Sequence, residues 1–167
     1  MKTSYYGNLK HIDTNAYEPV AISGDRGKLA GFYGRSMKAL SMPYDFFKRW
    51  KAEEDELQEL VSSFRITNEE FHRLKKQNEN EYIMVFYNEV LAYLDPRDVY
   101  EALGDNAVML CYEKPTDFCH RFLVAGWLEL SLGIEIDELG FENNPIVQEN
   151  RKRLKNEIAK MMHLENT

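Results

Sequence analysis

The chain has 167 residues, of which 44% are hydrophobic and 29% charged, a balance that fits one globular domain with its own core. The formal net charge of -7 argues against coating nucleic acid through a broad basic face, and leaves only a local basic pocket for such a ligand. No apolar run approaches the ~20 residues of a membrane span. The amino terminus lacks a secretory signal, so we expect a cytoplasmic protein with two free thiols.

Two short strands are predicted near the amino terminus, at residues 2–8 and 17–23, and each ends in a polar loop that contains glycine. In parallel α/β sheets, such loops line a ligand crevice at the carboxyl ends of the strands. The glycine-rich loop after the second strand suits an anionic ligand, and it equally fits a mobile surface loop. Its cationic side chains are Arg26, Lys28, Arg35 and Lys38. Neither a phosphate-loop pattern nor a dinucleotide fingerprint occurs in the chain.

The middle of the chain is predicted to be helical. A helix at 43–53 follows a proline start signal, and it places three aromatic side chains on one face. Residues 53–77 are strongly charged and carry a capping-box signal at Thr67, so we predict a charged helical insertion or lid. The most regular amphipathic helix is predicted at 78–94, and a short helix follows at 95–104.

The last third is predicted to contain a buried strand at 108–111, a helix over about 118–130, a short strand at 133–136 and an amphipathic helix at 144–163. Strands and helices that alternate in this way indicate an α/β domain with a mainly parallel sheet. We therefore predict one Rossmann-like three-layer domain over residues 1–167, with a small sheet flanked by helices.

The turn between the buried strand and the next helix concentrates the reactive side chains of the chain. They are Cys111, Glu113, Lys114, Asp117, Cys119, His120 and Arg121. With Asp117 as the N-cap, the helix begins at Phe118 and turns its free amides toward the crevice at the sheet edge. We predict an anion site there, because a helix amino terminus and nearby cations attract negative charge. The proposed ligand-binding side chains are Arg121, Lys114, Arg26, Arg35, Tyr5 and Tyr33, the tyrosines by stacking on a base.

Several chemical roles stay open for the same turn. A thiol at a helix amino terminus beside His and Arg has a lowered pKa, which makes Cys119 a candidate nucleophile with His120 as base. Adjacent helical residues point about 100° apart, however, which makes direct activation awkward. Cys111 joins these two residues as a set of metal donors, but the spacing matches no zinc pattern and shows no fourth ligand, so we assign no metal site. Glu113 is a candidate acid or base, or an ion-pair partner of a neighbouring cation.

The run LCYEKPTDFCHRFLVAGWL resembles the signature of the family named domain of unknown function 488, with Cys-x-Glu, a short turn and Cys-His-Arg before a helix. The segments TSYYGNL, VAIS and YDFFKRWK resemble its short members, so the similarity covers the chain except residues 53–77 and the tail. Longer members carry Asp-Val-Arg after the second strand. In this chain Ser-Gly-Asp-Arg occupies the same place, so the resemblance implies that any role of the arginine in that motif belongs to Arg26. It implies a Rossmann-like fold, a shared pocket and a contextual link to nucleotide or modified-base metabolism.

Three functions remain open from the sequence. The first is an enzyme acting on a nucleotide, nucleoside or other phosphorylated small molecule. The second is a ligand-sensing or protein-interaction module without turnover, which the incomplete catalytic constellation, the charged insertion and the tail helix favour. The third is a thiol-redox or metal protein that uses Cys111 and Cys119. We expect a small anionic ligand as the partner and no association with a membrane. The cofactor, turnover and homo-oligomerisation are left open.

Overall fold

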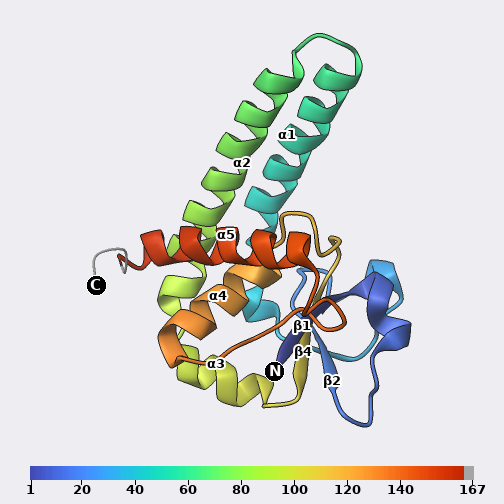
Figure 1. Cartoon of the computed structure of the whole chain (residues 1–167), viewed down its shortest axis with the longest axis vertical. Helices are drawn as coiled ribbons and strands as arrows, with labels where there is room; N and C mark the ends of the chain where they lie inside the picture. Colours follow the sequence, from blue (N-terminus) through green and yellow to red (C-terminus); the bar gives the residue numbers. More distant parts are fainter. Residues whose placement is uncertain (164–167) are drawn as a thin grey trace.

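The computed structural model describes residues 1–163 and has a single sheet flanked by helices (Figure 1). The sheet is entirely parallel, with strand order β1-β4-β2-β3. Its strands are β1 (Lys2–Tyr5), β2 (Glu18–Ala21), β3 (Arg35–Ser36) and β4 (Ala107–Cys111). The predicted Rossmann-like α/β class with a small parallel sheet is therefore confirmed.

Strand β4 lies between β1 and β2, and it positions the functional turn. All five of its residues are buried, as expected for a strand covered on both faces. Met109 and Cys111 face the helical side, whereas Val108 and Leu110 face a smaller core beneath the amino-terminal loops. Tyr5 of β1 pairs with Cys111, so the carboxyl ends of neighbouring strands meet at one edge.

The described residues also form five α-helices and four short 3-10 helices. The α-helices are α1 (Tyr44–Ser62), α2 (Asn68–Glu89), α3 (Pro96–Leu103), α4 (His120–Leu132) and α5 (Pro145–Met161). The 3-10 helices are η1 (Tyr6–His11), η2 (Lys28–Ala30), η3 (Lys38–Leu40) and η4 (Leu91–Tyr93). Helices α4 and α5 cross closely at Gly126, where a Cβ atom would lie 3.0 Å from the Cα atom of Lys155.

Helices α1 and α2 lie side by side as an arm that projects from the body of the domain (Figure 1). The predicted charged insertion at 53–77 therefore forms the outer parts of two continuous helices and the turn between them. The capping signal at Thr67 is confirmed, because its Oγ1 accepts a hydrogen bond from the Glu70 amide at 3.1 Å.

At the edges of the sheet, one predicted strand does not form and one observed strand was not predicted. No strand forms at 133–136, because Gly133 adopts a left-handed φ of 67° at the end of α4, and only the isolated bridge between Thr3 and Glu138 follows. Conversely, the two-residue strand β3 carries no apolar alternation that marks it in the sequence. The tail helix is confirmed as α5, with Asn144 as its N-cap.

None of the helices within residues 1–163 combines the length and the apolar character needed to cross a bilayer.

Candidate functional site

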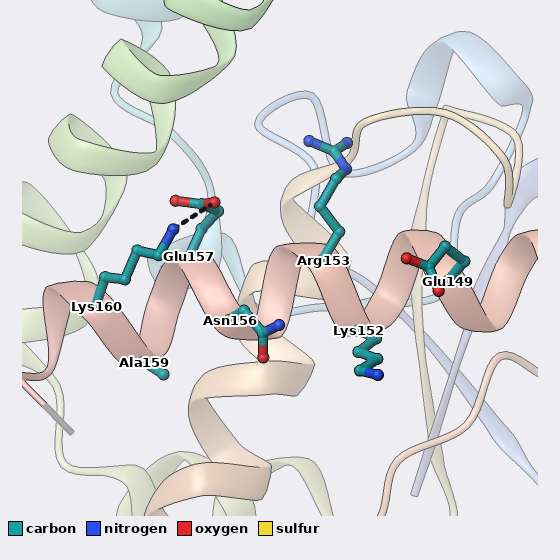
Figure 2. A pocket seen from close by; sticks show the side chains of 7 residues that line it. All are labelled: Glu149, Lys152, Arg153, Asn156, Glu157, Ala159 and Lys160. Carbon is teal, nitrogen blue, oxygen red and sulfur yellow. Dashed lines mark hydrogen bonds and ion pairs between the residues drawn. The ribbon is translucent and has the colours of Figure 1, made fainter. Parts of the chain in front are cut away.

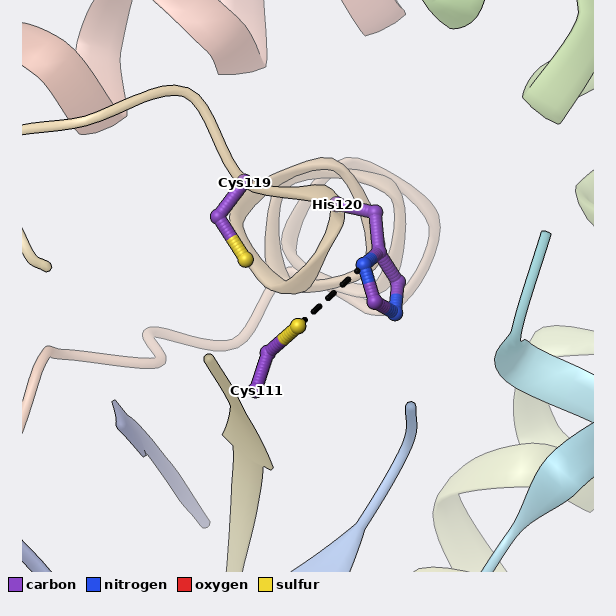
Figure 3. A group of neighbouring side chains, drawn as sticks. All are labelled: Cys111, Cys119 and His120. Atoms are coloured by element: carbon purple, nitrogen blue, oxygen red, sulfur yellow. Dashed lines mark hydrogen bonds between the residues drawn. The ribbon is translucent and has the colours of Figure 1, made fainter. Parts of the chain in front are cut away.

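Two cysteines and a histidine converge where β4 ends and α4 begins (Figure 3). Cys111 is the last residue of β4, Cys119 is the N-cap of α4, and His120 is the first helical residue. All three are buried, and one ligand atom from each lies within 4.8 Å of the others. The cysteines are free thiols, as expected from the sequence.

The histidine ring is oriented by the neighbouring strand. Its Nε2 lies 3.1 Å from the carbonyl oxygen of Ile22, just beyond β2. Because a carbonyl only accepts, Nε2 carries the hydrogen, and Nδ1 of the neutral ring is left as an acceptor. That Nδ1 lies 3.5 Å from the Sγ of Cys111. The ring interacts with both thiols, because Cys119, the partner predicted from the sequence, also forms a side-chain interaction with His120.

Burial controls the acid-base properties of the cluster. It raises the pKa of the Cys119 thiol to about 12, and the neighbouring Cys111 adds to this effect. The predicted lowering of the Cys119 pKa is therefore wrong. Burial and the nearby Cys119 also raise the pKa of Glu113 to about 7. For His120, burial alone would lower the pKa, but Cys119, the Glu113 carboxylate and the Ile22 carbonyl raise it.

Glu113 brings a carboxylate into contact with Cys111. Its Oε2 accepts a hydrogen bond from Cys111 Sγ at 3.3 Å, and its side chain keeps partial contact with solvent. It comes from the turn immediately after β4, two residues beyond Cys111. The cluster therefore has three buried potential metal donors, two sulfur atoms and one nitrogen, and the Glu113 carboxylate lies beside it at Cys111.

The side chain of Arg121 does not face a ligand crevice. Its side chain is fully buried, with Nε and Nη2 bound to the Glu138 carboxylate at 3.2 and 3.1 Å. Its Nη1 donates to the carbonyl oxygen of Glu113 at 2.8 Å, and the guanidinium lies over the Phe122 ring. The predicted exposure of Arg121 to an anion is wrong. Arg121 instead fixes the turn that carries Glu113.

The helix also starts later than the sequence indicated. Cys119 is the N-cap instead of Asp117, and the Asp117 carbonyl accepts a hydrogen bond from Asn150 of α5 at 2.9 Å. The ring of Phe118 packs against Trp50 and Tyr82 at the base of the arm. The residues between the strand and the helix are therefore held by α5 and the arm.

The remaining predicted ligand residues are not gathered at the cluster. Arg35 bonds to Glu18 at 2.6 Å and to the carbonyls of residues 102 and 103, which lie at the amino ends of the strands. Tyr5 packs on a phenylalanine ring, whereas Tyr33 is 86% exposed. Arg26 and Lys114 are exposed. The structure thus gives no shared cradle for an anion among the predicted cations.

Asp25 organises the loop after β2. Its carboxylate accepts hydrogen bonds from the amides of Gly27 and Leu29, each at 3.0 Å, and from the Ser23 hydroxyl at 2.9 Å. It also accepts one from the hydroxyl of Tyr112, the residue after β4. Partial burial opposes ionisation, but the bonds from Tyr112, Leu29 and Gly27 prevail and lower the pKa of Asp25 to about 2.

This lowered pKa predicts a defined loss of stability in acid. The stabilisation is fully present above the unfolded-state pKa of about 3.9, and it disappears as pH falls through about 2, where the folded carboxyl binds its proton. We expect wild type to exceed Asp25→Asn in unfolding free energy at pH 6, and this difference to shrink between about pH 4 and pH 2. Urea denaturation across this range measures it. A difference that is constant with pH would contradict the assignment.

The hollow along α5 does not resemble a ligand pocket. Figure 2 shows a shallow hollow along α5, lined by side chains of both charges that come from this one helix. The lining residues are Glu149, Lys152, Arg153, Asn156, Glu157, Ala159 and Lys160. Ligand pockets are instead concave and mostly apolar, with a few converging polar groups.

Comparison of the chain with protein-family models, curated proteins and solved structures finds no match. The resemblance of the Cys-x-Glu and Cys-His-Arg segments to domain of unknown function 488 therefore stays a prediction.

Proposed function

We propose that the protein binds a transition metal ion, Zn²⁺ in the first instance, through Cys111, Cys119 and His120. The observation that carries this proposal is the convergence of two thiols and an imidazole nitrogen within 4.8 Å, all buried. Thiolate and imidazole ligands select zinc over magnesium or calcium, which prefer oxygen donors.

The spacing of the three donor atoms is compatible with a tetrahedral site. Zn–S bonds of about 2.3 Å place tetrahedral ligand atoms about 3.8 Å apart, so small side-chain adjustments suffice to close the site. The bond from His120 Nε2 to the Ile22 carbonyl leaves Nδ1 for the metal, the arrangement that outer-shell partners usually impose on a ligating histidine. Glu113 lies outside this group of three, and its carboxylate beside Cys111 would supply the fourth donor once its side chain turns toward the ion.

With Glu113 as a fourth protein donor the site would be closed, which favours a structural or sensing role. Catalytic zinc sites usually have three protein ligands and an open position for water or substrate. Here the ion would join the end of β4 to the start of α4. A nucleotide or other phosphorylated ligand, the leading hypothesis from the sequence, has weaker support, because Arg121 and Arg35 are both engaged in ion pairs.

The metal content of the purified protein tests the proposal. After reconstitution and removal of free metal, we expect about one zinc ion per chain by elemental analysis. Cobalt substitution should give the thiolate-to-metal charge-transfer absorption of a Cys-ligated ion. The variant His120→Ala should lose both signals. The matched control, His72→Ala, alters an exposed histidine on α2 and should keep both. A folded wild type that takes up neither metal would overturn the proposal.

A further inference from the structure

Beyond Asp45 in the first turn, the exposed face of α1 carries a stripe of charges in two blocks. Lys48 and Lys51 lie in its first half, and Asp55 and Glu59 lie in its second half. Their spacing of i, i+3, i+7 and i+11 places all four on one stripe of the helix, and all four are exposed. The opposite face, through Trp50, packs against α2. The charged stripe therefore points away from the rest of the chain.

This order of charges does not stabilise α1 in the isolated chain. A helix dipole favours acidic side chains near the amino end and basic ones near the carboxyl end. Apart from Asp45 in its first turn, α1 has the reverse trend, with no basic residue in its last turn. The ion pair from Lys51 to Asp55, at 3.1 Å, also has the less stabilising orientation, with the cation on the amino-terminal side.

A second costly feature lies at the tip of the arm. Phe64 has a φ of 57° and is 94% exposed. It follows the C-cap of α1, and the amide of Arg65 bonds to the carbonyl of Leu60 at 2.9 Å, a helix ending that favours glycine at the position of Phe64. A large ring in this conformation adds strain and exposes apolar surface. At the other end of α1, Tyr44 and Phe47 are exposed by 74% and 38%.

We infer that two copies of this chain associate through antiparallel packing of their α1 helices. In one register, Lys48 meets the partner subunit's Glu59, and Lys51 meets the partner subunit's Asp55. The same register brings Phe64 to the partner's Tyr44 and the partner's Phe47. The two-fold arrangement makes every contact twice, whereas parallel packing would oppose like charges. Because the central contacts are ionic and exposed, the dimer is weak and sensitive to salt.

Charge reversal tests this dimer by sedimentation velocity of the full chain. We expect wild type to dimerise at low ionic strength and to dissociate as salt is added. Lys48→Glu with Lys51→Glu, and separately Asp55→Lys with Glu59→Lys, should each weaken self-association about tenfold or more. An equimolar mixture of the two variants should restore the dimer. Wild type that remains monomeric at low salt, or reversed variants that associate as well as wild type, would overturn the inference.

The variant Phe64→Gly distinguishes an effect on dimer association from an effect on the stability of the fold. Glycine relieves the positive φ, so the melting temperature of the variant should rise, while its dimer should weaken. A purely structural role for Phe64 does not predict these opposite changes, and an unchanged association constant would remove the aromatic contact from the interface. Both measurements are made with metal present and with metal chelated, so they report on the arm independently of the Cys-His site.

Discussion

Arg121→Met is expected to lower the free energy of unfolding by about 3–5 kcal/mol, because it leaves the Glu138 carboxylate charged and unpaired in the core. Both side chains are fully buried, and two hydrogen bonds join them, so no water can replace the lost partner. The variant also loses the bond from Arg121 to the Glu113 carbonyl, which holds the turn of the site. Chemical denaturation monitored by circular dichroism measures the change.

Two controls identify the buried charge as the cause. Replacing both partners, Arg121→Met with Glu138→Leu, should recover much of the loss, since no isolated charge remains. Arg49→Met, which removes the exposed ion pairs to Glu53 and Glu81, should lower the free energy of unfolding far less. A loss of similar size in Arg121→Met and Arg49→Met would show that the Arg121 pair contributes no more than a surface pair.

The second large effect is expected from zinc. At a free zinc concentration about a thousand times the Kd, the folded state should gain about 4 kcal/mol, because the ion binds the assembled donors much better than the unfolded chain. Differential scanning calorimetry in zinc buffer and in chelator measures the corresponding shift in melting temperature. The shift should diminish at acidic pH, since protons compete with the metal for the thiolates and imidazole.

Variants of the donor set distinguish this stabilisation from nonspecific effects. Cys111→Ser should lose most of the zinc-dependent shift, because the hydroxyl is a much poorer ligand for the ion than the thiolate. His72→Ala should shift as wild type does, since that residue lies on the arm. Equal melting temperatures of wild type in zinc and in chelator would contradict a metal-linked fold, whatever the oligomeric state.

Local sequence signals determined most of the secondary structure. The apolar run before Cys111 predicted a strand covered on both faces, and β4 is that strand. Side-chain caps depend only on nearby residues, so the capping signal at Thr67 marked the start of α2 correctly. The concentration of thiols, imidazole and carboxylate after β4 was also visible, because the strand and the helix that carry them are adjacent in the chain.

Tertiary structure alone decided how those groups are used. The sequence predicted Arg121 to be a cation that faces a ligand, but its guanidinium forms an ion pair with Glu138, seventeen residues away. Arg35 forms its ion pair at the amino ends of the strands. The Cys119 pKa moved opposite to the helix-dipole expectation because burial outweighs a nearby dipole. The Ile22 carbonyl, ninety-eight residues from His120, sets the free ring nitrogen. Backbone carbonyls and buried partners have no sequence signature, so spacing along the chain predicted which groups are present but not which of them meet.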